Sequence, residues 1–535
     1  MTERDYRPKD AEPKKAETVS DKLAMLDAAK LALSDVGRPD AVAKRRAMQM
    51  ATARERVDML CDAGTYREIG GLVEPDRGHD LSRDLVAPAD GAVTGTGHIN
   101  QKPVNILAQD FTVLGGSIGA VADAKCGRLV KFSRERGQPM VMLLEGGGHR
   151  IQDGMNAAHF AAASPVFREL ATLSGWVPMV TAIMGQGFAG PTAYASMCDF
   201  VVMLRGKSTM GIAGPALVKA GTAGEITKED LGGATRQADQ QGIADLAVDT
   251  EEECLNAIRR FLSYLPQNAG EAPPVVPCDD PIGRREDALL ELVPADSRRV
   301  YNMKKVINAI ADKDSVLELK PGYARNMITV FARLNGGPVG IFANQPMRKG
   351  GILDVPACEK AAHFIALCDA FGLPLVSLID IPGISIGPAA EDTGLGRRSG
   401  RLFFEMGIAT VPLASVVLRK GYGGGYYAMG GGRAFDANIA LAWPTAEICA
   451  MSIEGAVDVA YRKQYEAATD PQAKRAELIA KIKVQTSALD AASGFGIDDV
   501  IDPRDTRRIL IETFASCPAR RSNPAPPRHR PISPI

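Results

Sequence analysis

Hydrophobic residues in this chain gather in short continuous runs that alternate with stretches of helical period. The run Val104–Gln109 leads into a glycine-bearing loop, and a helical stretch follows in which Lys125, Arg128 and Lys131 fall on polar positions. A second run, Pro139–Glu145, ends at glycine. Because continuous apolar runs are typical of strands buried on both faces, the pattern predicts an α/β fold with a mainly parallel sheet.

The same pattern occurs twice. A further helical stretch at Val166–Ser174 and a third run at Val177–Met184 complete a β-α-β-α-β order, which the second half of the chain repeats. When Gln101–Gly148 is aligned with Gly336–Gly383, the offset is 235 residues throughout. The matched pairs are Pro103 with Pro338, Ile106 with Ile341, Gly115 with Gly350, Gly137 with Gly372, and Glu145 with Asp380, among others. After a one-residue slip, Gly187 matches Gly421 and Gly190 matches Gly424. So many matches in one register predict a duplicated domain.

The domain boundaries follow from composition. The Pro-rich stretch Leu265–Pro281 separates the two halves, so we expect a first domain at 51–270, a linker at 271–281 and a second domain at 282–516. Residues 1–50 would form an N-terminal helical extension. The polar, Pro-rich segment 517–535 is predicted to be a disordered tail.

Composition limits the possible partners. Of the 535 residues, 45% are hydrophobic and 24% charged, and the net charge is −1, as in an ordinary soluble globular protein without an electrostatic footprint for nucleic acid or an acidic membrane. The nine cysteines form no C-x-x-C pair, so neither a metal site nor a disulfide framework is expected. The N-terminus lacks an apolar core and no apolar run reaches about 18 residues, which predicts a cytoplasmic protein with no membrane span.

One glycine loop raises the question of a nucleotide site. Gly185, Gly187 and Gly190 spell the G-x-G-x-x-G pattern of dinucleotide-binding loops. The repeat argues against that interpretation, because Gly185 falls on Arg419 in the second half. The acidic residue that should follow by about 20 positions is also missing, since Asp199 comes much sooner.

An oxyanion hole is the alternative that the repeat favours. Glycines at a strand-to-helix turn expose backbone N–H groups, and the start of the helix adds partial positive charge, which together can stabilise the enolate of a thioester. Each half carries two such loops, EGGGHR and GFAG in the first and DIPGIS and GYGGGY in the second. For any single glycine, a purely structural turn remains the alternative. The chain has no G-x-S-x-G, Walker or H-E-x-x-H motif that would supply a nucleophile, a phosphate loop or a metal site.

Several blocks of the sequence resemble the carboxyltransferase β subunits of biotin-dependent acyl-CoA carboxylases, of the propionyl-CoA and methylcrotonyl-CoA type. They include DGAVTGTGHINQKPVNILAQDFTVLGGSIG, GGGHRIQDG, NQPMRKGGILD, GYGGGYYAMGG and AWPTAEICAMSIEGAV, in the order that is usual in that family. The resemblance covers about Thr52 to Thr513. It implies two tandem crotonase-like domains and an activity that moves CO2 from carboxybiotin to an acyl-CoA through an enolate.

The resemblance also implies roles for particular residues. Those implied to act on the reacting oxygens are Gly148, Ala189, Gly190, Gly424 and Gly425; those implied to bind substrate are Gly147, His149 and Tyr427; and those implied to bind biotin are Gly383, Ile384 and Tyr422. No biotin-attachment sequence of the A-M-K-M kind occurs, so biotin is expected on a partner, a biotin carboxylase or biotin carboxyl carrier subunit. In such enzymes the site lies between the first domain of one subunit and the second domain of another, which implies a homo-oligomer, expected to be a hexamer.

Departures from the family pattern leave the acyl group open. Glu145 and His149 replace a small residue and alanine, Ala189 and Pro191 also differ, and Tyr427 stands where propionyl-type enzymes carry aspartate. Two other functions stay open at this point. A crotonase-type hydratase or hydrolase would use Glu145 as its general acid or base, and a non-catalytic scaffold would only stabilise an active paralogue.

Overall fold

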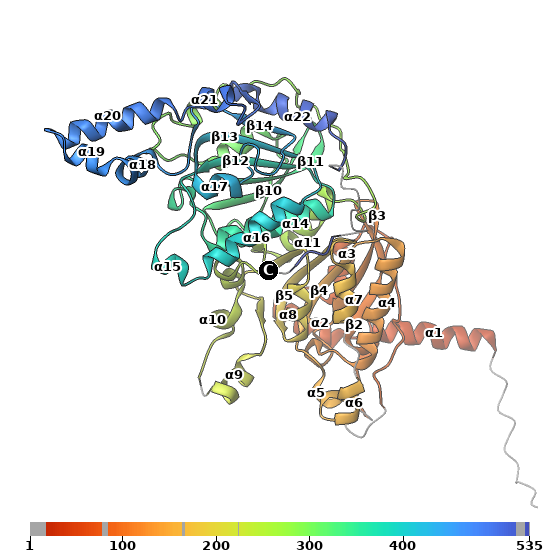
Figure 1. Ribbon diagram of the computed structural model, residues 1–535. Helices are drawn as coiled ribbons and strands as arrows, with labels where there is room; N and C mark the ends of the chain where they lie inside the picture. The colour runs from red at the N-terminus through yellow and green to blue at the C-terminus, as the bar shows by residue number, and fades with distance from the viewer. Residues whose placement is uncertain (1–17, 78–83, 163–165, 223, 521–529, 534–535) are drawn as a thin grey trace, which may run out of the picture.

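The computed structural model describes residues 18–77, 84–162, 166–222, 224–520 and 530–533. These residues form two α/β domains that lie side by side (Figure 1). Within the described ranges, no helix combines the length and the apolar character that crossing a membrane requires. None of the nine cysteines forms a disulfide.

An eight-stranded sheet forms the centre of the first domain. Its strands run in the order β1-β2-β3-β4-β5-β6-β8, with β7 paired beside β5. β2 pairs antiparallel with both β1 and β3, and the remaining pairs are parallel. The strands are β1 (Arg67–Glu68), β2 (Ala92–Ile99), β3 (Lys102–Gln109), β4 (Met140–Gly146), β5 (Met179–Phe188), β6 (Phe200–Leu204), β7 (Thr209–Gly211) and β8 (Leu246–Val248).

The second domain repeats this sheet strand for strand. Its order is β9-β10-β11-β12-β13-β14-β16, with β15 paired beside β13. The strands are β9 (Leu317–Leu319), β10 (Met327–Leu334), β11 (Gly337–Asn344), β12 (Leu375–Ile381), β13 (Leu413–Tyr422), β14 (Ile439–Ala442), β15 (Glu447–Cys449) and β16 (Asp499–Val500). Each strand of one sheet has a counterpart at the same place in the other, so the predicted duplication and the α/β fold are confirmed.

The helices repeat as well. Paired by their position in the two domains, they are α3 (Ala53–Leu60) with α13 (Met303–Ile310), α4 (Ala120–Arg136) with α14 (Val355–Ala370), α7 (Phe167–Leu173) with α16 (Leu395–Ile408), α8 (Gly190–Ser196) with α17 (Gly423–Ala428), and α11 (Glu251–Tyr264) with α22 (Thr506–Ser516). The first domain adds α5 (Ile151–Gly154), α6 (Ala157–Ala162), α9 (Pro215–Thr222) and α10 (Lys228–Gly232), and the second adds α12 (Leu289–Leu292), α15 (Pro388–Glu391), α18 (Ile453–Ala460), α19 (Arg462–Glu466), α20 (Pro471–Val484) and α21 (Ala488–Ser493). In the N-terminal extension, α1 (Val19–Leu33) projects from the body and α2 (Pro39–Ala47) packs against it (Figure 1).

Aromatic side chains join the two domains through one core. Phe261 of α11 stacks on Phe200 of β6, with ring centroids 4.5 Å apart, and lies 5.6 Å from Phe331 of β10 in the second domain. Phe331 in turn lies 5.5 Å from Phe364 of α14. All four rings are buried in the same cluster, so burial of α11 fixes how the domains sit against each other.

The structure corrects the prediction that Lys125 lies on a polar face. Its side chain is buried, and its ammonium group donates to the carbonyl oxygen of Ala89 at 2.9 Å. Lys360 occupies the same place in α14 and donates to the carbonyl oxygens of Lys320, Tyr323 and Met327 at 2.8 to 2.9 Å. In each domain a buried lysine therefore donates to backbone carbonyl groups near the ends of the strands. Helical periodicity alone cannot distinguish such a lysine from a solvated one.

Of the tail predicted to be disordered (517–535), residues 521–529 and 534–535 lie outside the described ranges, but part of the remainder is ordered. Residues 530–533 are held against both domains: the backbone N–H of Ile532 donates to Ser174 Oγ at 2.8 Å, and Ile532 is buried in the shared core. Arg530 pairs with Asp369 of the second domain at 2.5 Å. A Cβ on Gly175 would collide with the backbone of Arg530, so this glycine makes room for the segment.

Candidate active site

The first-domain glycine turn is formed where two neighbouring strands end. β4 and β5 are paired in parallel, with Gly146 opposite Gly187, so the loops that follow them emerge side by side. A Cβ on Gly148 would lie 2.7 Å from the Cβ of Ala189 and 3.5 Å from the nitrogen of Gly190. The two loops can therefore touch only because Gly148 has no side chain.

The N–H groups of Gly148 and Gly190 have no acceptor among the described residues. The loop around Gly148 is fixed by Ile118, whose N–H donates to the Gly148 carbonyl at 3.0 Å and whose carbonyl accepts from Arg150 at 2.8 Å. Both N–H groups lie at or beside the start of α8, where the helix dipole adds partial positive charge.

Two other residues that the resemblance placed here do not offer their N–H groups. The N–H of Gly147 donates to the Gly115 carbonyl at 3.3 Å, and that of Ala189 donates to the Gly211 carbonyl at 2.9 Å. Ala189 instead shapes the turn: it adopts φ 57° and ψ −107°, a backbone conformation that glycine tolerates better, and its counterpart Gly423 has φ 60°. Of the four first-domain residues that the resemblance placed at the thioester oxygen, only Gly148 and Gly190 therefore keep an N–H group without an acceptor among the described residues.

The second-domain turn has the same construction. β12 and β13 pair with Ile381 opposite Gly421, and the loop is fixed by Leu353, whose N–H donates to the Gly383 carbonyl at 3.1 Å. A Cβ on Gly425 would lie 3.1 Å from the carbonyl carbon of Gly383, so these loops also touch through glycine. The counterparts of Gly148 and Gly190 are Gly383 and Gly424, and their N–H groups likewise have no acceptor in the described part of the chain.

The side chains predicted to bind ligands lie beside these turns. His149 packs its ring edge-on against Phe160, with centroids 5.3 Å apart, and Ile384 occupies the corresponding place in the second domain. Tyr427 is 54% exposed on α17, whereas Tyr422 is buried and donates its hydroxyl hydrogen bond to Glu447 Oε2 at 2.9 Å. Of the two tyrosines, the one predicted to bind substrate, Tyr427, is therefore exposed, and the one predicted to bind biotin, Tyr422, is not.

Glu145 is not available as a general acid or base. It is 1% exposed, and its carboxylate accepts from Arg45 at 2.7 and 2.9 Å and from Arg56. Burial alone would raise the pKa of Glu145, but the charges and hydrogen bonds of Arg56 and Arg45 outweigh that effect and hold the pKa below its usual range. The geometry therefore gives no support to a hydratase that uses this residue.

The same carboxylate explains the first glycine of the G-x-G-x-x-G pattern. A Cβ on Gly185 would collide with the Glu145 carboxylate, so Gly185 makes room for a buried ion pair and not for a nucleotide. In the second domain Asp380 replaces Glu145, and Arg419, at the position of Gly185, pairs with it at 3.0 Å together with Lys420 at 2.8 Å. The cations come from the N-terminal region in one domain and from β13 in the other.

Sequence patterns alone did not reveal Arg45 and Arg56. Arg45 belongs to α2 of the N-terminal extension and Arg56 to α3, and both sit in stretches rich in exposed charges. The available signal was the repeat itself, because an acidic residue occurs at the same point of both halves and needs a partner if it is buried.

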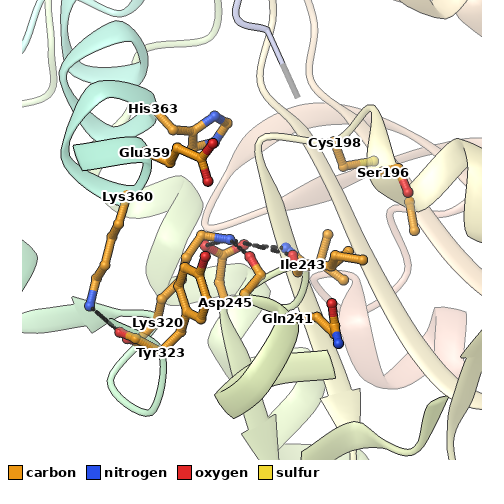
Figure 2. Close-up of a pocket in the computed structure, with 13 residues that line it drawn as sticks. Ser196, Cys198, Gln241, Ile243, Asp245, Lys320, Tyr323, Glu359, Lys360 and His363 are labelled. Atoms are coloured by element: carbon orange, nitrogen blue, oxygen red, sulfur yellow. Dashed lines mark hydrogen bonds and ion pairs between the residues drawn. The ribbon is translucent and has the colours of Figure 1, made fainter. Parts of the chain in front are cut away.

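A pocket lies between the domains, near the C-terminal end of α8. It has a volume of about 200 Å³ and is lined by first-domain residues such as Cys198 and Gln241 and by second-domain residues such as Tyr323 and His363 (Figure 2). The Lys360 ammonium donates hydrogen bonds to backbone carbonyl groups (Figure 2). The pocket offers neither the paired N–H groups nor the strand-to-helix turns of the candidate site.

Comparisons with known proteins identify the class. The carboxyl transferase domain family matches residues 44–532. The chain is 39% identical over 496 residues to the propionyl-CoA carboxylase carboxyltransferase subunit of Haloferax mediterranei. The matched segment covers 92% of this chain and 95% of that protein. It is 36% identical over 512 residues to the methylmalonyl-CoA decarboxylase subunit alpha of Veillonella parvula. That match covers 96% of this chain and 99% of the relative.

A solved structure agrees with these relatives. The transcarboxylase 12S crystal structure, described as a hexamer with methylmalonyl-coenzyme A bound, superposes with a TM-score of 0.92 at 35% identity and covers 98% of this chain and 100% of its own. The chain belongs to the carboxyl transferase domain family of biotin-dependent enzymes. It is an acyl-CoA carboxyltransferase, as the resemblance predicted.

Replacing Glu145 with glutamine should lower the thermal unfolding midpoint strongly. Glu145→Gln leaves the guanidinium of Arg45 buried without its carboxylate, and breaking a buried pair from one side costs about 3–5 kcal/mol. The matched control is Glu225→Gln, which removes an exposed ion pair with Lys219 and should cost less than about 1 kcal/mol. Differential scanning calorimetry of the three proteins would show the contrast.

The pH dependence of that difference has a definite sign. Because the folded-state pKa of Glu145 is depressed, its stabilising contribution is present above the ordinary carboxyl pKa and is lost as pH falls through the lower folded value. The gap in midpoint between wild type and Glu145→Gln should therefore stay constant near neutral pH and narrow only in acid. A gap that widens in acid, or no gap at neutral pH, would contradict the buried pair.

Proposed function

We propose that this enzyme transfers CO2 from carboxybiotin to the α carbon, or the vinylogous carbon, of an acyl-CoA through an enolate stabilised by the first-domain turn. The observation that carries the proposal is the pair of N–H groups on Gly148 and Gly190, which have no acceptor among the described residues and are shielded by no β-carbon. Fixed donors of this kind act where negative charge develops, and the oxygen of a thioester gains that charge when the neighbouring carbon loses its proton.

The second-domain turn fits the ureido oxygen of biotin. Gly383 and Gly424 repeat the donor pair, and a side chain on Gly425 would press on the Gly383 loop and on Ile381. When bound, carboxybiotin would supply both the CO2 and, after releasing it, the base for the α-proton. The chain itself would bind and orient the two oxygens, so no catalytic side chain is required, in keeping with the buried ion pairing of Glu145 and Asp380.

Biotin is proposed to arrive on a partner. The sequence has no A-M-K-M attachment site, so a biotin carboxylase or biotin carboxyl carrier subunit would present the carboxylated group. The acyl group stays unassigned, because relatives at similar identity carry the names of propionyl-CoA carboxylase and methylmalonyl-CoA decarboxylase. A screen of acyl-CoA thioesters with the carrier partner present would identify it.

A second copy of the chain is proposed to complete the site. Figure 1 shows α8 and α17 well apart in their separate domains, so one chain does not bring its two turns together. Large apolar side chains lie exposed just after each turn: Ile151, Met155 and Phe160 in the first domain and Ile386 in the second. Another copy would cover such residues, and the related 12S structure is described as a hexamer.

The oligomeric state gives a direct test. Light scattering should show a particle whose mass is a multiple of 56.8 kDa, expected to be six chains, and activity should follow that particle on dilution. Both domains of every chain would then face a neighbour's domain of the other type. An active monomer would contradict the shared site.

The two turns should serve different substrates. Valine keeps the backbone N–H but adds a side chain that should displace or obstruct the turn, and losing the action of one oxyanion donor costs about 10²–10³ in kcat. Gly190→Val should therefore reduce formation of carboxylated acyl-CoA, whereas Gly424→Val should reduce decarboxylation of carboxybiotin measured without acyl-CoA. Gly283→Val is the matched control, because a Cβ there meets nothing within 4 Å. Circular dichroism should confirm folding, since Gly190 also packs against Ile118. Folded variants that lose the same half-reaction would refute the division.

Tyr427 should govern which acyl group is used. Its exposed phenol occupies volume beside the second-domain turn and offers one hydrogen bond, so Tyr427→Asp and Tyr427→Ile should reorder kcat/KM across a panel of acyl-CoA thioesters by about 10-fold or more. The buried neighbour Tyr426 is packed under Gly431 and is not expected to contact substrate. Unchanged relative kcat/KM values would show that Tyr427 does not line the pocket.

A further inference from the structure

The two glycine turns are anchored by different side chains, although their backbones match. In the first domain, the Thr192 hydroxyl donates to the carbonyl oxygen of Gly187 at 2.5 Å, lies 3.0 Å from that of Gly211, and accepts from the Gly211 N–H at 2.9 Å. This one hydroxyl ties the start of α8 to β5 and β7. The counterpart of Thr192 in the second domain is Tyr426, whose ring packs against glycines and cannot make the same bridge.

In the second domain, a tyrosine hydroxyl bonded to a carboxylate connects the corresponding strands. Tyr422 is the last residue of β13 and directly precedes the turn, and its hydroxyl donates to Glu447 Oε2 at 2.9 Å. Glu447 begins β15, where it pairs with Lys420 of β13. The first-domain counterparts, in the same register of β5 and β7, are Phe188 and Thr209, which cannot form a hydroxyl–carboxylate bond.

We infer that Glu447 is a positioning residue for the biotin-side turn, acting through the hydroxyl of Tyr422. The inference rests on the proposed assignment of the second-domain turn to biotin. By holding the Tyr422 ring, Glu447 fixes the backbone at the start of the turn. Gly423 follows with φ 60°, and this conformation sets the direction of the Gly424 N–H. Thr209, the first-domain counterpart of Glu447, does not have this role, because Thr192 anchors the first-domain turn.

Glu447 is itself held in a fixed direction. Its other carboxylate oxygen pairs with Lys483 at 3.0 Å, and Lys483 lies near the end of α20. Its backbone also lies at an antiparallel bridge to Ser487, while the next residue, Ile448, donates its N–H to the Thr486 carbonyl at 2.8 Å. Burial and the charge of Glu447 raise the pKa of the Tyr422 hydroxyl, so the hydroxyl keeps the proton that it donates.

Steady-state kinetics with free biotin as carboxyl acceptor and a carboxylated acyl-CoA as donor would test the inference. Tyr422→Phe and Glu447→Ala should each lower kcat/KM for biotin roughly 10-fold, as expected for the loss of a hydrogen bond to a charged group, and leave the KM for the acyl-CoA within about 2-fold. Glu447→Gln should recover most of the loss, because its amide oxygen can still accept. The double variant Tyr422→Phe with Glu447→Ala should be no worse than either single variant.

Two controls separate positioning from general loosening. Tyr465→Phe removes a hydroxyl–carboxylate bond of the same kind, to Asp458 at 3.2 Å in the helices α18 and α19, and should leave both substrates unaffected. Lys483→Met removes only the outer ion pair, which is partly exposed, and should change kcat/KM for biotin less than Glu447→Ala does.

The possible outcomes decide between the inference and the function on which it rests. Equal losses for biotin and acyl-CoA, additive losses in the double variant, or no loss in Tyr422→Phe would each overturn the positioning role. Gly424→Val is assayed alongside: if it impairs use of biotin while Tyr422→Phe does not, only the inference fails. If Gly424→Val also leaves biotin use unchanged, the assignment of the second turn fails.

Discussion

A buried carboxylate beside each glycine turn is the constraint on which the rest of the site depends. Glu145 is the penultimate residue of the central strand of the first sheet, and Asp380 is that of the second. Both are almost completely removed from solvent. A buried charge is tolerated only when it is paired and hydrogen-bonded, so each domain must bring two cations to the same point. The first domain recruits Arg45 and Arg56, which docks α2 and α3 onto the sheet. The second domain uses Arg419 and Lys420 of its own strand β13.

The duplicated fold shows how one backbone geometry can be held by different means. Both turns need glycine where the loops meet, because a β-carbon on Gly148 or Gly425 would strike the neighbouring loop. The residues that hold the turns are not repeated: Thr192 bridges two strands in the first domain, and Tyr422 with Glu447 does so in the second. Backbone contact therefore requires glycine in both turns, whereas the side chains that anchor the turns differ between the domains.

Two of the residues predicted to bind substrate lie at the outer face of the turns. Tyr427 is exposed on α17, and His149 packs against Phe160, which is itself more than half exposed. In the proposed oligomer these side chains would meet across the boundary between two chains. Selectivity for the acyl group would then depend on a surface that no single chain completes, so identity to relatives with different named substrates does not decide it.

The sequence by itself determined the α/β class, the duplication and the position of both glycine turns. Strand runs and glycines are local signals, and a constant offset between Gln101 and Gly336 makes them visible without any knowledge of contacts. Only the tertiary structure decided which N–H groups remain available, because the partner of Ala189 is Gly211 on another strand. It also decided that Gly185 makes room for Glu145, that Lys125 is buried, and that residues 530–533 are anchored. Each of these depends on a contact between residues far apart in the chain, and neither composition nor periodicity encodes which distant group will occupy a given space.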